Sequence, residues 1–241
     1  MVQRVARILD VLHDAAAARA PAPSLTEVAG RSSIPLTSTH RLLRQLVGER
    51  FVERNGAGYS LGPRLFELGE HTTQRLELRR VALPFMQDLF EVTRQVVQLG
   101  VLDRRHVVYV EKIGGHRQVP SPSRLGGRVE ATCTALGKAM LAYDDDAYAE
   151  AVEGVALAQL TKWSITDKER LRDDLLEVRK RGFAVDREEA ALGLACVAAP
   201  LTSHGRVVGA ISVSVSAGSF DVDRLAPAVR SVALAIGRRL R

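Results

Sequence analysis

Cysteine is scarce in this chain of 241 residues, which contains only Cys133 and Cys196. Two cysteines cannot build a disulfide framework, and they cannot form a thiolate metal site by themselves. The six histidines are scattered and do not show a metal-ligand spacing such as HExxH. The sequence therefore predicts neither a bound metal nor a cofactor.

Long apolar runs are also missing. None reaches the length of about 20 residues that spans a membrane as a helix, and the opening MVQRVAR is not followed by the apolar core of a signal peptide. We therefore expect a cytoplasmic protein without a membrane partner. Apolar residues still make up 46% of the chain, enough for a sizeable core, and the length of 241 residues favours two domains.

Negative charge is in the minority. The formal net charge is +6 and the isoelectric point is near 9.7, which is compatible with a polyanionic partner. Residues 1–62 contain eight arginines and no lysine against five acidic residues, a balance of +3, and the rest of the chain supplies the other +3. Positive charge is therefore denser in the N-terminal part.

Residues 24–61 have the pattern of a helix-turn-helix with a wing, and an apolar stripe around residues 5–12 predicts a helix before it. SLTE, from Ser24 to Glu27, is a capping box, which begins a helix by satisfying free backbone N–H groups. GRSS interrupts this helix. The pair Ile34-Pro35 then begins a second one, because proline is tolerated in the first turn.

The second helix of this motif has two unlike faces. Side chains at i, i+3, i+4 and i+7 would pack inward, and these are Thr39, Leu42, Leu43 and Leu46. The opposite face and its flanks have hydrogen-bond donors and no acidic group, as a helix in the major groove requires. The DNA-binding residues expected on this helix are Thr37, Ser38, His40, Arg41, Arg44 and Gln45.

A predicted wing follows the second helix directly. FVE and YSL flank the glycine-rich stretch RNGAG, which indicates a strand, a turn and a return strand. Arg54 is expected at the tip of the turn, where it suits a phosphate or the minor groove. Two helices alone would equally fit an ordinary helical hairpin with a solvated arginine face. The wing favours duplex DNA as the partner.

The remainder of the chain predicts a linker helix over residues 63–80 and a second domain over residues 81–241. Hairpins alternate irregularly with helices there, in place of a regular βαβ order, so we expect an α+β domain with an antiparallel sheet. The expected strands lie near residues 96–102, 107–112, 196–201 and 206–216, and helices are expected over 81–93, 134–143, 166–182 and 222–239.

One place where polar groups converge is the stretch ATCTALGK, residues 131–138. Small residues there would let a ligand approach the free amides of a helix start, where the helix dipole favours a carboxylate or phosphate. In the simpler interpretation, Thr134 only caps its helix and Lys138 is a solvated or paired surface group.

The last strand is a second such place. Ser212, Ser214 and Ser216 alternate with apolar residues, and the preceding strand is almost wholly nonpolar. This pattern indicates that both faces of the sheet are covered. Serines on a covered face need hydrogen-bond partners, and a small polar ligand is one way to supply them.

The third place combines Asp186, in the stretch DREE, with the thiol of Cys196. A carboxylate beside a thiol leaves open an enzyme with Cys196 as nucleophile. However, no histidine has a defined relation to Cys196, and most buried cysteines are inert. We therefore expect no enzyme. A further alternative is a constitutive DNA-binding protein without an effector.

Taken together, these motifs resemble the IclR family of bacterial transcription regulators along nearly the whole chain. The resemblance rests on THRLLRQLVGERFVERNGAGYSLGPRLFELG in the first half and on motifs such as TALGKAMLA, GFAVDREE, CVAAPL and AISVSVS in the second. It implies a homodimer, often a dimer of dimers, with a GAF-like effector domain. Two-fold symmetry then predicts a roughly palindromic operator.

In this family a small metabolite, frequently an organic or aromatic acid, occupies the effector domain and changes operator binding. The motifs imply that the effector-binding residues here are Ala135, Leu136, Asp186, Cys196, Ser212 and Ser214. The segment GGRVEATC before TALGKA departs from the family pattern, so the covering of the pocket is expected to differ.

Overall fold

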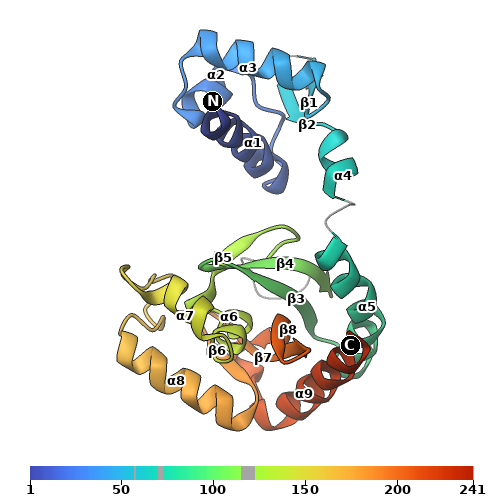
Figure 1. Ribbon diagram of the computed structural model, residues 1–241, viewed down its shortest axis with the longest axis vertical. Coiled ribbons are helices and arrows are strands. Elements are labelled where there is room, and N and C mark those ends of the chain that lie inside the picture. Colours follow the sequence, from blue (N-terminus) through green and yellow to red (C-terminus); the bar gives the residue numbers. More distant parts are fainter. Residues whose placement is uncertain (57, 70–72, 115–122, 241) are drawn as a thin grey trace. The chain divides into compact units, whose positions relative to one another are not determined.

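The computed structural model describes residues 1–56, 58–69, 73–114 and 123–240 (Figure 1). They form two compact units, Met1–Thr73 and Gln74–Arg241, and each unit has its own apolar core. Among the described residues, no helix is both long and apolar enough to cross a membrane.

The first unit is a helix-turn-helix with a wing. Its core includes Ile8, Val28 and Leu43, all fully buried. The described elements are the helices α1 (Val2–Ala17), α2 (Leu25–Ser32), α3 (Leu36–Gly48) and α4 (Arg64–Gly69) and the strands β1 (Val52–Asn55) and β2 (Gly58–Leu61).

The predicted capping box at the start of α2 is confirmed. The backbone N–H of Ser24 donates to Oε2 of Glu27 at 2.7 Å, and the backbone N–H of Glu27 donates to Oγ of Ser24 at 3.4 Å. The predicted start of the next helix is slightly early, because Pro35 precedes the first helical residue, Leu36.

The wing is also present, but the expected position of Arg54 is wrong. Arg54 lies within β1, paired with Tyr59, and the ladder continues to Asn55 and Gly58. The strand is longer than expected because Nδ2 of Asn55 donates to Oγ of Ser60 at 2.9 Å and Gly56 takes a left-handed φ of 61°. Arg54 is therefore on the side of the wing.

The second unit is built on a six-stranded antiparallel sheet, which confirms the α+β class (Figure 1). Its order, β5-β4-β3-β8-β7-β6, places the last hairpin beside the first. The strands are β3 (Val96–Asp103), β4 (His106–Ile113), β5 (Arg128–Glu130), β6 (Ala184–Arg187), β7 (Leu194–Ser203) and β8 (Arg206–Ser216).

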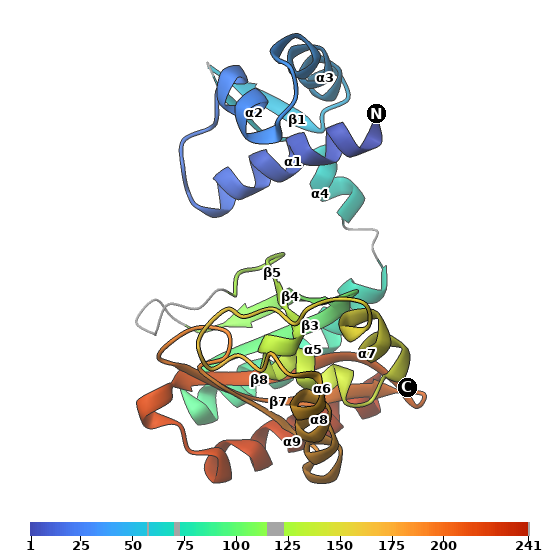
Figure 2. The ribbon, with the colours of Figure 1, turned by 90° about the vertical axis from the view of Figure 1, so that its left-hand side faces the viewer.

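Helices cover both faces of this sheet. Helices α5 (Thr73–Thr93) and α9 (Val222–Arg239) pack together on one face, with Met86 and Val229 fully buried. Helices α6 (Ala135–Leu141), α7 (Asp145–Val152) and α8 (Lys168–Arg181) lie on the other side, as Figures 1 and 2 show. Short 3₁₀ turns over Ala131–Cys133 and Ala217–Ser219 complete the described elements.

The two covering layers explain the alternation in β8. Ile211, Val213 and Val215 belong to the core under α5 and α9. Ser212 and Ser214 point to the side of α6 and are only 1% and 2% exposed. The prediction that both faces of the sheet are covered is therefore confirmed.

Several boundaries differ from those expected. α5 runs without interruption through residue 80, where the linker helix was expected to end, and contains Pro84. The side chain of Asp167 caps α8, whose first helical residue is Lys168, two residues after the expected start at residue 166. The helix ends as expected at Gly182, which has a φ of 77°. Helix α7 and strand β6 were not predicted, since both are short.

Candidate DNA interface and ligand pocket

Helix α3 places its residues as the apolar spacing predicted. Leu42, Leu43 and Leu46 are buried, and the hydroxyl of Thr39 donates to the carbonyls of Ile34 and Pro35 at 3.2 Å each. Ser38 is half-buried at the edge of this face, and the other predicted donors are exposed, namely Thr37, His40, Arg41, Arg44 and Gln45.

Among the described residues, the arginines of this exposed face are not paired with acidic side chains. Within the described residues, Arg41, Arg44 and Arg54 form no ion pair. By contrast, Arg50 pairs with Glu67 at 2.7 Å and Arg64 pairs with Glu49 at 2.6 Å. Helix α3 and strand β1 therefore each present unpaired guanidinium groups, which is what a phosphate or a guanine edge requires.

In the second unit, most of the predicted effector residues meet at one cavity between α6 and the sheet. Ala135, Leu136, Asp186, Cys196 and Ser212 all line it, and Ser214 lies beside Cys196. The other lining residues were not predicted, and they are Gln98, Tyr109, Ala190 and Leu194. Thr134, which was expected to cap α6, lines the cavity as well.

This cavity is almost closed. Its volume is about 10 Å³, the space that one water molecule needs, whereas pockets for small molecules are commonly about 300–1,000 Å³. A small-molecule ligand could therefore enter only if the cavity widened.

Gln98 on β3 is the hydrogen-bonding centre of the cavity wall. Its Oε1 accepts from Oγ of Ser212 at 3.2 Å and from Oγ of Ser214 at 3.0 Å. Ser214 in turn lies 3.0 Å from the sulfur of Cys196. The covered serines thus have partners within the protein, so they do not by themselves require a ligand. A lone polar residue in the apolar stretch VVQLGV was the available sequence signal.

Asp186 lies on β6 opposite Cys196 and is 1% exposed. Burial and the nearby carboxylate of Glu189 raise the pKa of Asp186 to about 7, although Lys138 and the backbone N–H of Glu189, 2.7 Å from Oδ1, act in the opposite direction. The cavity therefore contains a carboxyl group that exchanges its proton near neutral pH.

Cys196 is a protonated thiol in this environment. Burial and the charge of Asp186 raise its pKa well above the ordinary value. The thiolate is the nucleophilic form of cysteine, so these surroundings disfavour the alternative in which Cys196 performs catalysis.

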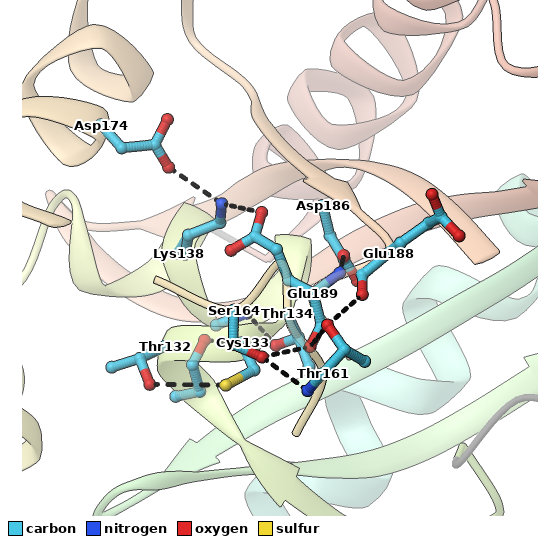
Figure 3. A network of polar contacts seen from close by, with 12 residues as sticks. Thr132, Cys133, Thr134, Lys138, Thr161, Ser164, Asp174, Asp186, Glu188 and Glu189 are labelled. Carbon is cyan, nitrogen blue, oxygen red and sulfur yellow. Dashed lines mark hydrogen bonds and ion pairs between the residues drawn. The ribbon is translucent and has the colours of Figure 1, made fainter. Parts of the chain in front are cut away.

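Lys138 is buried, contrary to the expectation from the sequence. Instead of being a surface group, it is 1% exposed, and its ammonium lies 2.7 Å from Oε1 of Glu189 and 2.9 Å from Oδ2 of Asp174 (Figure 3). Burial alone would lower the pKa of Lys138, but the two carboxylates raise it, so the lysine stays charged. The expectation of pairing was correct, and the expectation of exposure was wrong.

The segment that contains Glu189 and Ala190 is also anchored through its backbone. Oγ of Ser164 donates to the carbonyl of Glu189 at 2.8 Å, and Oγ1 of Thr161 donates to that of Glu188 at 2.6 Å (Figure 3). Since Ala190 lines the cavity, these bonds and the Lys138 pair together keep one wall in place.

The start of α6 follows the simpler of the two interpretations. Oγ1 of Thr134 accepts from the backbone N–H of Gly137 at 3.0 Å and so caps the helix. Glycine is required at 137, because a Cβ there would lie 2.1 Å from the carbonyl oxygen of Ala131.

A larger hollow lies between α7 and α8. It measures about 330 Å³ and is lined by groups that include Tyr148, Ala149, Arg172 and Arg179. None of the residues expected to bind the effector reaches it, so it is a competing position for a ligand. Among the described residues, no group of three or more histidine, cysteine, aspartate or glutamate side chains could bind a metal ion.

Comparison with known proteins assigns both units. Residues 1–56 match the IclR helix-turn-helix domain, and residues 70–238 match the C-terminal domain of bacterial IclR transcriptional regulators. The chain is 30% identical to the regulator XynR of Escherichia coli over 99% of this chain and 96% of XynR. It is 34% identical to KdgR of the same organism over 83% of this chain and 78% of KdgR.

Solved structures agree with this assignment. An IclR homolog from Microbacterium hydrocarbonoxydans, complexed with 4-hydroxybenzoate, has a TM-score of 0.89 and 26% identity over 100% of this chain and 98% of that one. A regulator from Alicyclobacillus acidocaldarius has a TM-score of 0.83 and 28% identity over the same shares of the two chains. The chain therefore belongs to the IclR family of bacterial transcriptional regulators.

Proposed function

We propose that this protein binds an operator as a homo-oligomer and changes its DNA affinity when a small organic or aromatic acid enters the cavity beside Asp186. The observation that supports it most directly is the exposed face of α3. There, Arg41 and Arg44 are unpaired among the described residues, and the side chains behind them are buried.

The exposed face supplies the two kinds of contact that operator binding needs. Arginine donates to guanine in the major groove or to phosphate, and shorter donors such as Thr37 and Gln45 contact neighbouring base edges. Arg54, on the side of the wing, would contact the DNA backbone. In a two-fold symmetric dimer the half-sites recur at a fixed spacing, so the operator is roughly palindromic.

The choice of ligand class rests on the family and on the cavity. A relative of the same fold was crystallised with 4-hydroxybenzoate, an aromatic acid. The cavity is lined by apolar side chains together with hydroxyl, thiol and carboxyl groups. This is the composition of a small-molecule site. Because it is nearly closed, the ligand must stabilise a more open arrangement. Such a difference in affinity between two arrangements is what allows a ligand to change DNA binding.

A second candidate function is a constitutive DNA-binding protein without an effector. The small cavity and the internal bonds of Ser212 and Ser214 to Gln98 favour it. The two candidates differ in whether any small molecule changes the affinity of the full chain for DNA.

A two-stage experiment tests the proposal. Duplexes that bind the full chain are first selected from a random library, and we expect enrichment of a two-fold symmetric site. Dissociation from that site is then measured with a panel of aromatic and aliphatic acids. A ligand that changes the affinity supports the effector proposal, and a panel without effect favours the constitutive protein. Failure to enrich any duplex would contradict the proposal that the protein binds DNA.

A further inference from the structure

A basic hollow lies between the start of α1 and the middle of α3. Arg4 and Arg7 of α1 line one side of it, and Ser38 and Arg41 of α3 line the other. Its volume is about 550 Å³, and all three arginines are exposed. The sequence motifs account for Arg41 but not for Arg4 and Arg7.

The two helices hold this hollow in a defined shape. Ile8 and Leu12 of α1 belong to the same buried core as Leu42 and Leu43 of α3, with exposures from 0% to 4%. Arg4 and Arg7 are three residues apart and therefore share one helix face. Their guanidinium groups are thus presented from a packed helix next to the exposed face of α3.

The charge of the hollow indicates what kind of group fits it. No acidic residue is among those that line it, and within the described residues none of its three arginines forms an ion pair. Three neighbouring cations without counterions attract an anion. Since guanidinium groups bind phosphate in bidentate geometry, phosphate oxygens suit this hollow particularly well.

The position of the hollow favours duplex DNA over a free anion. Arg41 belongs both to the hollow and to the exposed donor face of α3, so a DNA strand bound at this face would lie next to the hollow. From this arrangement we infer that Arg4 and Arg7 bind the phosphodiester backbone and so set the position of α3 in the major groove. This inference rests on the DNA binding that is proposed above.

Such contacts have a measurable signature that differs from base contacts. Binding to phosphates contributes affinity for any sequence, and each phosphate contact that is lost lowers the salt dependence of binding by about one unit of slope in log K against log salt. Base contacts, in contrast, affect the operator more than random DNA.

The test uses the full chain with four single variants, Arg4→Gln, Arg4→Lys, Arg7→Gln and Arg19→Gln. Arg19 is an exposed arginine just beyond the other end of α1, so its variant removes the same charge at a distance from the hollow. Binding to a random-sequence duplex and to the selected operator is measured by fluorescence anisotropy at about 50 to 200 mM salt, the range in which phosphate contacts change affinity most visibly.

We expect the Arg4 and Arg7 variants to weaken binding to both duplexes equally, and to reduce the slope by about one per bound subunit, whereas Arg19→Gln has a smaller effect. Arg4→Lys should restore the slope, because lysine retains the charge. Variants of Arg4 and Arg7 that resemble Arg19→Gln would overturn the inference, as would a loss confined to the operator. If the unmodified chain bound neither duplex, the proposed function itself would fail.

Discussion

The ammonium of Lys138 lies 2.7 Å from Oε1 of Glu189, and both side chains are buried. Lys138 belongs to α6, and Glu189 belongs to the segment that precedes β7, so the pair joins two walls of the cavity. Asp174 extends the pair to α8. The other carboxylate oxygen of Glu189 is buried without a hydrogen-bond partner among the described residues, so its charge depends largely on Lys138.

Replacing Lys138 by methionine should destabilise the second unit strongly. Removing one partner of a buried ion pair leaves an uncompensated charge and typically costs about 3–5 kcal/mol of unfolding free energy. Urea denaturation measures this change. Lys180→Met is the matched control, because Lys180 pairs with Glu177 in an exposed position and its loss should have little effect. Equal effects of the two variants would contradict the importance of burial.

Asp186 should make stability depend on pH in a defined direction. Its pKa is raised from 3.8 to about 7 in the folded protein, so the folded state retains a proton that the unfolded state releases. The stabilisation is fully present below pH 3.8 and is lost as pH rises through about 7, at about 1.4 kcal/mol for each pKa unit. Glu189, whose pKa burial also raises, acts in the same direction.

We therefore expect the unfolding free energy to fall between about pH 4 and 7, and to fall less in Asp186→Asn. Denaturant titrations at several pH values measure this difference. Asp223→Asn, at the exposed start of α9, serves as the control and should follow the parent protein. A parent profile that rises over this range, or an Asp186→Asn profile identical to it, would show that the carboxyl group is not the cause.

Operator binding should depend on Arg44. Its guanidinium group is exposed on α3, so Arg44→Ala should weaken binding by about 1–3 kcal/mol if the group contacts guanine. Gel-shift titrations against the selected operator and against single-base variants measure the loss. It should be smallest on the duplex that lacks the contacted guanine. Arg206→Ala, in an exposed position of the second unit, should leave binding unchanged. Full affinity of Arg44→Ala would exclude it from base recognition.

The position of the effector should be decided by two matched substitutions. Ala190→Leu adds bulk to the nearly closed cavity beside Asp186, and Ala149→Leu adds the same bulk to the hollow between α7 and α8. Both alanines are half-buried. We expect Ala190→Leu to abolish the effect of the ligand on DNA affinity while Ala149→Leu preserves it. The reverse pattern would move the effector to the other hollow.

Gly137→Ala should destabilise the protein, although alanine normally favours a helix. The added Cβ would lie 2.1 Å from the carbonyl oxygen of Ala131, which is backbone and cannot easily move. Overpacking of this kind costs about 1–3 kcal/mol. Gly30→Ala in α2 meets no atom within 4 Å and should instead stabilise its unit by about 0.5–1 kcal/mol. Thermal unfolding of both variants reports the opposite signs, and a stabilised Gly137→Ala would be inconsistent with the close approach.

The first unit was predictable because its signals are local. The capping box joins Ser24 to Glu27, three residues apart, and the buried face of α3 follows from spacing within a single helix. The position of Arg54 in the wing was predicted wrongly, since two additional ladder pairs include it in the strand. Strand length depends on both partners, and the sequence of one partner does not show it.

The cavity was predictable only in part. Asp186, Cys196 and Ser212 were identified from motifs, and the structure brings them together. Gln98 was missed because its partners, Ser212 and Ser214, are 114 and 116 residues further along the chain. Lys138 was assigned to the surface for the same reason, since neither Asp174 nor Glu189 is near it in sequence.

By itself, then, the sequence determined most of the helices and strands, which face of α3 is exposed, and the family. Each of these depends on residues within a few positions of one another or on motifs of the chain. Only the tertiary structure decided that Lys138 is a buried cation, that Gln98 satisfies the serines of β8, that Arg4 and Arg7 adjoin α3, and that the cavity is nearly closed. These properties depend on the pairing of distant strands and on the packing of helices against each other and the sheet, which no local pattern specifies.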